Sequence, residues 1–195
     1  MNPTEPDQPP FPPQQIRTVF LDRDGVINRK PPEGQYIGRW SDFHILPGAV
    51  DAIAALNRSG RRVLVVSNQR GIALGLYTGG DVNALHATLQ EHLAKHSAHV
   101  DAFYFCPHDK NQCDCRKPGT LLFEEAFRDF PDASRANSIL IGDSISDIQA
   151  ARNLGIPSIF IQGDPETQKP GAGDAAHLAD AVSASLREAV DRFLP

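Results

Sequence analysis

The chain alternates between short unbroken apolar runs and longer segments in which apolar residues recur every three or four positions. The unbroken runs predict buried β-strands near residues 17–21, 62–66, 100–105, 138–141 and 158–162. The segments with helical spacing predict helices over 47–60, 81–97, 120–129 and, at the C-terminus, around 175–193. This alternation of strands and helices predicts a doubly wound, parallel α/β sheet.

Length and composition restrict the class of protein further. With 195 residues, 41% apolar and 22% charged, the chain is expected to form one globular domain over 16–195. Residues 1–15 contain six prolines and are expected to be a disordered tail. The net charge of −5 disfavours nucleic-acid and membrane partners. Without a long apolar run or a secretory signal, the expected location is the cytoplasm, and we expect a monomer.

Two carboxylates stand directly after the first predicted strand. Asp22 and Asp24 are followed by Gly25, which permits a sharp turn. Open α/β sheets bind their ligands at the carboxyl ends of strands. Carboxylates this close favour a hard cation such as Mg²⁺, and an aspartate in such a place can attack phosphorus. For this motif taken alone, an ordinary Asp-Gly turn is the alternative.

Two further segments are expected to contact a substrate. The loop over 29–40 holds three cations, Tyr36 and the single tryptophan, and loops of that length are usually functional. The second strand is followed by four polar residues that can donate hydrogen bonds to a phosphate, namely Ser67, Asn68, Gln69 and Arg70. The alternatives are a surface loop and a capped turn. The histidines at 86, 92, 96 and 99 are expected on the solvated surface of helix 81–97 or at its end.

All three cysteines lie between residues 106 and 115. The spacing Cys106-x-His108-x4-Cys113-x-Cys115 provides four ligands for a closed, tetrahedral Zn²⁺ site. With no open coordination position, such a zinc would hold the loop in shape and take no part in catalysis. Unlinked thiols near a stray histidine are the alternative.

Charged pairs follow this loop and the fourth strand. Arg116 can bind a phosphate with two hydrogen bonds, and Lys117 can act on it as a point charge; a solvated basic pair is the alternative. Asp143 follows Gly142 at the end of a strand, and Asp147 is four residues further on. This spacing predicts both carboxylates on one face of the next helix, with a simple helix cap as the alternative.

The order of these motifs resembles that of the haloacid dehalogenase (HAD) superfamily of phosphohydrolases. The motifs are Asp22-Arg23-Asp24-Gly25, Ser67-Asn68-Gln69, Arg116-Lys117-Pro118 and Gly142-Asp143-x3-Asp147. The zinc loop makes the chain similar to the branch that contains heptose-bisphosphate and histidinol-phosphate phosphatases. The resemblance covers residues 17 to about 163 and implies a HAD-like fold without the long insertions that form mobile caps.

The resemblance also implies roles for single residues. Asp22 would attack the phosphorus and form an aspartyl-phosphate, and Asp24 would be the general acid and base. Mg²⁺ would be held by Asp22, Asp143 and the main-chain carbonyl of Asp24, while Ser67 and Lys117 would stabilise the transferred phosphoryl group. Asp147 would act through Asp143 or Lys117. The residues expected to bind the rest of the substrate are Arg23, Tyr36, Asn68, Gln69, Arg70 and Arg116.

Two departures from the family pattern concern recognition of the substrate. Only four residues separate His108 from Cys113, and Lys117-Pro118 is followed directly by Gly119. The leading hypothesis is a phosphatase of a small sugar bisphosphate, foremost the heptose 1,7-bisphosphate. Histidinol phosphate or another small phosphomonoester is the alternative. A nucleic-acid 3′-phosphatase is disfavoured by the acidic charge, and a non-catalytic zinc module by the three convergent carboxylates.

Overall fold

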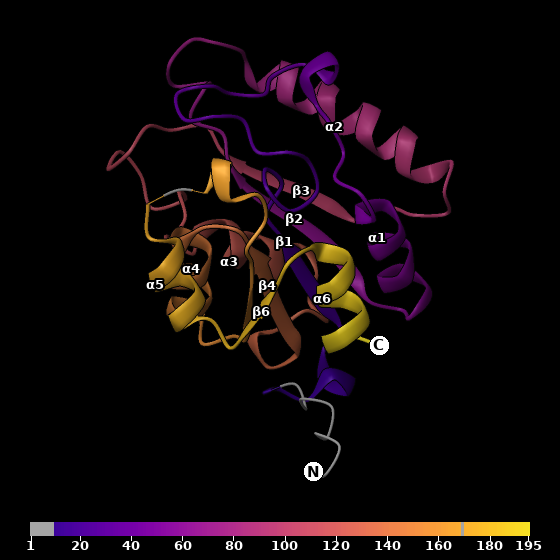
Figure 1. The fold of residues 1–195 in the computed structure, drawn as a ribbon. Coiled ribbons are helices and arrows are strands. Elements are labelled where there is room, and N and C mark those ends of the chain that lie inside the picture. Colours follow the sequence, from indigo (N-terminus) through magenta and orange to yellow (C-terminus); the bar gives the residue numbers. More distant parts are fainter. Residues whose placement is uncertain (1–9, 169) are drawn as a thin grey trace.

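Six parallel strands form the sheet at the centre of the protein. We describe residues 10–168 and 170–195 of a computed structural model of the chain (Figure 1). The sheet has the order β3-β2-β1-β4-β5-β6. Its strands are β1 (Thr18–Leu21), β2 (Arg62–Asn68), β3 (Ala102–Cys106), β4 (Ser138–Gly142), β5 (Ser158–Ile161) and β6 (Ala181–Ser183). This confirms the doubly wound, parallel α/β fold that the alternating pattern predicts.

Three helices cover each face of the sheet (Figure 1). One face carries α1 (Ala49–Arg58), α2 (Gly79–Ala94) and α6 (Leu186–Phe193), and the other carries α3 (Leu121–Asp129), α4 (Ile145–Leu154) and α5 (Ala172–Leu178). Successive side chains of a strand point to opposite faces. In β1, Val19 and Leu21 therefore pack in the first layer, and Phe20 packs in the second.

The strand order creates a switch point between β1 and β4. The chain runs outward from β1 to β2 and β3, then returns to β4 on the other side of β1. Loops that leave the two strands diverge at this point and leave a crevice at their carboxyl ends. Asp22 follows β1 and Asp143 follows β4, so the topology brings them together although 121 positions separate them in the chain.

The C-terminal part differs from its prediction. The helix expected around 175–193 is divided into α5, β6 and α6. β6 has only three residues and pairs with β5, with Ile159 opposite Ala181. Such a short strand leaves almost no alternating pattern, while α5 and α6 on either side carry helical spacing. Helix 81–97 is also shorter than predicted, since α2 ends at Ala94.

The proline-rich tail predicted over 1–15 lies partly outside the described residues. Of the residues that are described, Phe11 is 7% exposed and its ring lies 6.4 Å from that of Phe193. Pro13–Gln15 forms one turn of 3-10 helix, and the Pro13 carbonyl accepts a hydrogen bond from Arg61. Phe11 thus packs in an apolar site against α6, as a large apolar side chain favours.

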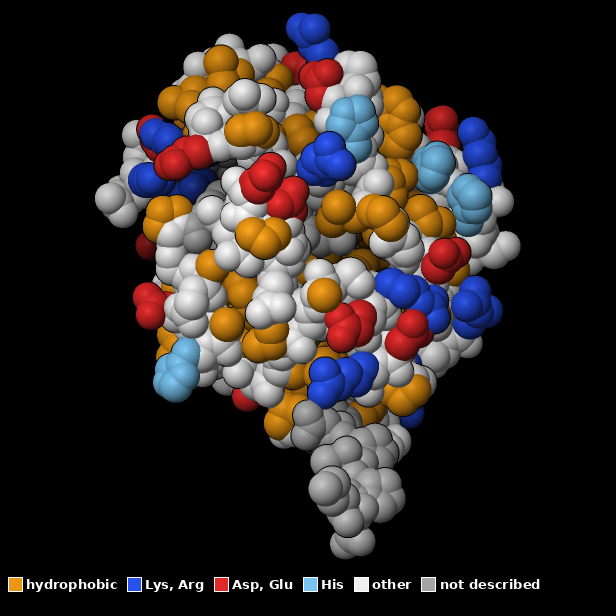
Figure 2. All heavy atoms as spheres, in the orientation of Figure 1, with side chains coloured by type: hydrophobic (Ala, Val, Ile, Leu, Met, Phe, Trp, Pro, Cys, Tyr) orange, Lys and Arg blue, Asp and Glu red, His pale blue; other side chains and the backbone are white. Residues whose placement is uncertain are grey.

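The surface of the protein carries charges of both signs, in keeping with the composition of the sequence. On the face drawn in Figure 2, Lys and Arg side chains are interspersed with Asp and Glu and form no continuous basic surface. Among residues 10–168 and 170–195, no helix has the length and apolar character that crossing a bilayer requires.

Candidate active site

A cavity of about 1190 Å³ opens at the carboxyl ends of β1, β2 and β4. Five segments of the chain contribute to its lining, at 30–37, 68–70, 110–121, 144–147 and the described part of 166–170. These include the loop over 29–40 and the cysteine loop, as expected for a fold without a separate cap. The carboxylates of Asp22, Asp24 and Asp147 form part of its wall.

Lys117 links two carboxylates at the base of the cavity. Its Nζ lies 2.9 Å from Asp22 Oδ1 and 2.6 Å from Asp147 Oδ1, and it donates to the Val66 carbonyl at 2.6 Å. Burial alone would lower the pKa of Lys117, but the two carboxylates raise it, so the side chain is a buried ammonium. The pKa of Asp22 is raised by burial and by Asp147, although Lys117 opposes the shift. The cluster thus places one fixed cation beside the expected nucleophile.

Asp143 completes the group of carboxylates. One carboxylate oxygen each from Asp22, Asp143 and Asp147 lie within 4.8 Å of one another. Burial raises the pKa of Asp143 to about 7, even though the Lys30 ammonium contacts its Oδ2. A side chain at Gly25 would collide with this carboxylate, and Gly25 also has φ +99°, so the turn after Asp24 requires glycine.

Asp147 is oriented by the start of α4. Its carboxylate accepts hydrogen bonds from the Ser144 main-chain N–H at 3.0 Å and from the Ser144 hydroxyl at 2.5 Å, which forms a capping box. Asp143 precedes the first residue of α4 and does not share a helical face with Asp147, so the predicted i,i+4 arrangement is wrong. The carboxylates meet because the cap turns Asp147 back toward the end of β4.

Asp24 is held by three neighbours. Arg23 Nη2 donates to both of its oxygens at 3.0 and 3.1 Å, Asn28 Nδ2 donates at 2.9 Å, and Gln69 Nε2 donates at 3.2 Å. Burial alone would raise the pKa of Asp24, but the Arg23 charge and these hydrogen bonds lower it below its ordinary value. Asp24 is therefore a carboxylate in a fixed orientation.

Three of the residues predicted to bind substrate have other partners. Arg23 has 0% exposure and lies behind Asp24, outside the cavity lining. Gln69 is 1% exposed; it accepts hydrogen bonds from Arg23 and Tyr77 and donates to Ser67 Oγ. The amide of Asn68 is engaged at both ends by the main chain of Lys117. Their hydrogen bonds orient Asp24 and Lys117. Asn68 and Gln69 also line the cavity, so their contact with substrate stays a prediction, whereas Arg23 lies outside the lining.

The remaining predicted contacts line the cavity. Arg70 forms a salt bridge with Asp109 of the cysteine loop, and its Nη1 lies 3.3 Å from the Tyr36 hydroxyl. This pair joins the loop after β2 to the cysteine loop. Arg116 also lines the cavity, and its Nη1 is buried without a hydrogen-bond partner among the described residues. Ser67 is fully buried, lies outside the cavity lining and accepts a hydrogen bond from Gln69 Nε2 at 3.2 Å.

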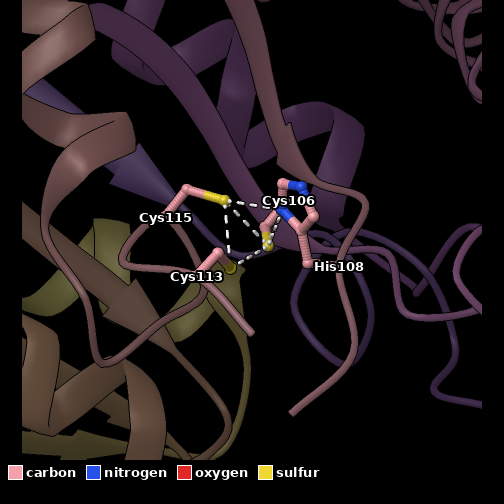
Figure 3. A group of neighbouring side chains, drawn as sticks. All are labelled: Cys106, His108, Cys113 and Cys115. Carbon is pink, nitrogen blue, oxygen red and sulfur yellow. Dashed lines mark hydrogen bonds between the residues drawn. The ribbon is translucent and has the colours of Figure 1, made fainter. Parts of the chain in front are cut away.

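Four potential metal ligands converge on one point beside the cavity, namely Cys106, His108, Cys113 and Cys115 (Figure 3). The sulfur atoms lie 3.0 to 3.4 Å apart, and His108 Nδ1 lies 3.2 Å from Cys115 Sγ and 3.7 Å from Cys106 Sγ. Ligands of a tetrahedral zinc at about 2.3 Å from sulfur would be separated by roughly 3.5–3.8 Å. The four side chains thus have the donor types and the convergence that a metal ion requires.

Three residues around the site belong to none of the predicted motifs. Lys30 contacts Asp143. Tyr77 lines the cavity and donates to Gln69 at 2.9 Å, and its ring fills the space that side chains at Gly38 and Gly71 would need. His86 was expected on the solvated surface but is 4% exposed, on the inner face of α2. The position of Tyr77 and the burial of His86 both depend on the tertiary packing.

Comparisons with known proteins identify the family of this chain. The family model described as HAD-hydrolase-like matches residues 114–189. A D-glycero-α-D-manno-heptose-1,7-bisphosphate 7-phosphatase from Mycobacterium bovis is 39% identical over 171 residues, 87% of each chain. A D-glycero-β-D-manno-heptose-1,7-bisphosphate 7-phosphatase from Escherichia coli K12 is 33% identical over 92% of this chain and 96% of that one. The chain belongs to the HAD-like hydrolase family.

A solved structure agrees with this assignment. The D,D-heptose 1,7-bisphosphate phosphatase from B. bronchiseptica, complexed with magnesium and phosphate, superposes with a TM-score of 0.80. It is 29% identical, and the match covers 90% of this chain and 97% of that chain. The family resemblance drawn from the four motifs is therefore confirmed, and this chain is a phosphatase of the HAD type.

Proposed function

We propose that this protein is a Mg²⁺-dependent phosphatase that removes one phosphate from a D-glycero-D-manno-heptose 1,7-bisphosphate. The observation that carries the proposal is the position of Arg116. It lines the same cavity as Asp22 and Lys117 and has a buried N–H group without a partner among the described residues. One relative that matches most of the chain is named as a phosphatase of the α anomer of the sugar, and another as a phosphatase of the β anomer. Which anomer this chain hydrolyses is therefore decided by assay.

The expected reaction proceeds through Asp22. A carboxylate oxygen of Asp22 forms a bond to phosphorus while the bond from phosphorus to the sugar oxygen breaks. The sugar oxygen keeps the electron pair and takes a proton from Asp24. The negative charge of the arriving phosphate opposes the carboxylate form of Asp24 and so favours uptake of that proton.

The second half returns the enzyme to its starting state. Water attacks phosphorus, its proton passes to Asp24, and the bond from phosphorus to Asp22 breaks. Lys117 is fixed between Asp22 and Asp147, where its charge can stabilise the transferred phosphoryl oxygens in both halves. The Ser67 hydroxyl is assigned to the same oxygens.

Two metal sites belong to this proposal. Asp143 Oδ1 is buried without a hydrogen-bond partner among the described residues, and the neighbouring carboxylates offer hard oxygen ligands that suit Mg²⁺. Asp22, Asp143 and the Asp24 carbonyl would hold this ion, which would neutralise charge on the phosphoryl group. Cys106, His108, Cys113 and Cys115 would hold Zn²⁺ and keep Arg116 and Lys117 in place.

Arg116 is assigned to the phosphate that does not react. Lys30 and Lys117 contact carboxylates, and Arg70 is paired with Asp109. Each of these cations is already compensated by an anion, and Lys110, the other cation of the lining, is exposed to solvent. A guanidinium with a free buried N–H group suits a second phosphate, which it can bind through two charge-assisted hydrogen bonds.

Phosphate release across a panel of substrates tests the proposal. The panel contains both anomers of the heptose bisphosphate, the corresponding monophosphates and histidinol phosphate. Arg116→Ala should lower kcat/KM for bisphosphates by about 10- to 150-fold, the value of one charged hydrogen bond, and should spare monophosphates. Arg128→Ala, an exposed arginine on α3, is the control. Equal losses on both substrate classes would remove the role in reading a second phosphate and move a monoester such as histidinol phosphate ahead.

A further inference from the structure

His86 lies in an apolar layer between α2 and β3. Its ring is stacked on Phe103, with centroids 4.3 Å apart and planes inclined by 15°, and it meets the edge of Phe105 at 6.1 Å. Burial of a polar ring in such a place is costly unless the ring has a hydrogen-bonding task. Its Nδ1 has no partner among the described residues, while its Nε2 lies 3.5 Å from Arg23 Nη1.

The chemistry of the contact defines the state of the ring. Arginine only donates hydrogen bonds, so His86 Nε2 is the acceptor and the proton belongs on Nδ1. The tautomer follows from this donor role. Burial and the adjacent Arg23 charge lower the pKa of His86 to about 3, which agrees with a neutral imidazole. His86 is therefore a fixed acceptor directed at a buried cation.

Arg23 is the link from His86 to the site. Its Nη2 serves both oxygens of Asp24 together with the Ile37 carbonyl and Gln69 Oε1. Its Nη1 is directed at His86. The two ends of the guanidinium thus have different partners, the expected acid and base at one end and, at the other, a ring outside the cavity lining.

We propose that His86 is a positioning residue, which holds the Arg23 guanidinium so that Asp24 keeps the orientation needed for proton transfer to the leaving oxygen. The inference rests on the proposed function, because it assumes that Asp24 is the proton donor. Without the acceptor at His86, Nη1 loses its partner inside the protein and the guanidinium turns toward other acceptors. Asp24 then loses the hydrogen bonds that fix both of its oxygens.

A comparison of leaving groups tests the proposal in His86→Phe, which keeps the stacked ring and removes the acceptor. A sugar alkoxide needs a proton as its bond to phosphorus breaks, whereas 4-nitrophenolate leaves as an anion. The ratio kcat/KM reports the steps up to departure of the leaving group. We expect His86→Phe to lower kcat/KM for the sugar phosphate by about tenfold and to leave that for 4-nitrophenyl phosphate within about twofold.

Three further variants make the outcome decisive. His92→Phe is the same exchange on the same helix, at a half-buried position against Trp40, and should match the wild type on both substrates. His86→Gln returns an acceptor and should restore most of the lost activity. His86→Met, which accepts hydrogen bonds only weakly, replaces His86→Phe if the latter does not fold.

Asp24→Asn separates failure of this inference from failure of the proposed function. If Asp24→Asn lowers kcat/KM equally for both substrates, Asp24 is not the leaving-group acid, and the roles of both Asp24 and His86 are overturned. If Asp24→Asn lowers kcat/KM selectively for the sugar phosphate but His86→Phe does not, only the role of His86 is overturned. An equal loss on both substrates in His86→Phe would identify a merely structural histidine.

Discussion

The side-chain amide of Asn68 forms two hydrogen bonds with the main chain of Lys117. Lys117 N–H donates to Asn68 Oδ1 at 3.0 Å, and Asn68 Nδ2 donates to the Lys117 carbonyl at 3.2 Å. The residue after Ser67 on β2 thereby fixes the backbone of a residue 49 positions away. Asn68 is predicted to act on the reaction through the placement of the Lys117 ammonium.

Asn68→Ala should therefore lower kcat without removing any group that touches the phosphate. Misplacement of a catalytic group by about 1 Å can cost as much as 100-fold, so we expect a loss of about 10- to 100-fold in kcat with a smaller change in KM. Steady-state kinetics measures the effect. Asn83→Ala, on the exposed surface of α2, is the control. Unchanged kcat in a folded Asn68→Ala protein would show that Lys117 needs no such support.

Asp22→Asn tests the nucleophile directly. The amide has nearly the shape of the carboxylate but cannot attack phosphorus, so phosphate release should fall by several orders of magnitude. The variant should still fold, because Asp22 lies at the end of a strand whose core residues are untouched. Near wild-type turnover of the purified variant, with its thermal unfolding transition intact, would exclude an aspartyl-phosphate.

Lys30 is predicted to compete with a divalent cation for Asp143. Its ammonium contacts Asp143 Oδ2 and is only 4% exposed. Mg²⁺ at the unpartnered Asp143 Oδ1 would share this carboxylate with the Lys30 ammonium, and a charge-assisted contact of this kind is worth about 1.5–3 kcal/mol. Lys30→Met should thus bind Mg²⁺ at least about tenfold more tightly in the absence of substrate, as measured by titration calorimetry. Lys110→Met removes an exposed cation of the same cavity and should leave the affinity unchanged. A weaker affinity in Lys30→Met would contradict the competition.

The cysteine loop should carry about one zinc ion per chain. Cys113→Ser should release that zinc, speed hydrogen exchange in residues 106–116 and reduce activity indirectly, since Arg116 and Lys117 follow the last ligand. The sheet should stay folded because Cys113 is only half-buried and the core layer on the other face of the sheet contains no cysteine. Elemental analysis and hydrogen exchange check these outcomes. A chain purified without chelator that contains no zinc would rule out the assignment.

The burial of neutral His86 should make the fold sensitive to acid. The pKa of His86 is about 3 in the folded protein and 6.5 ordinarily. As pH falls below 6.5, the unfolded chain takes up a proton that the folded protein does not, so the free energy of unfolding decreases. The contribution is at most about 1.4 kcal/mol per pH unit. It is fully present above pH 6.5 and is lost toward pH 3.

Denaturant unfolding measures this contribution of His86 to the free energy of unfolding. Wild type and His86→Gln are compared at several pH values between about 6.5 and 4.5. The variant lacks the imidazole, so the difference in unfolding free energy between the two proteins should shift in its favour as the pH falls. Parallel pH dependence of wild type and His86→Gln would mean that His86 is protonated without cost in the folded protein.

The sequence by itself determined the fold class and the location of the chemistry. Asp22, Ser67 and Asp143 each stand at the end of an apolar run long enough to be a buried strand, and parallel strands bring such ends to one edge. The cysteine cluster was predictable because its four side chains lie within ten positions of each other. The strand ends and the cysteine cluster each depend on residues that are close together in the chain, so the sequence pattern alone predicts them.

Only the tertiary structure decided which polar groups orient the expected catalytic residues. Arg23, Asn68 and Gln69 sit among site residues in the sequence, yet their hydrogen bonds are made inward, to Asp24 and Lys117. His86 falls on a helix whose spacing leaves its environment open, and Phe103 and Arg23 on other elements bury it. The three-residue β6 exists because it pairs with β5. In each case the partner is distant in the chain, so the hydrogen bond or the packing that defines the role forms only once the sheet and its helices are assembled.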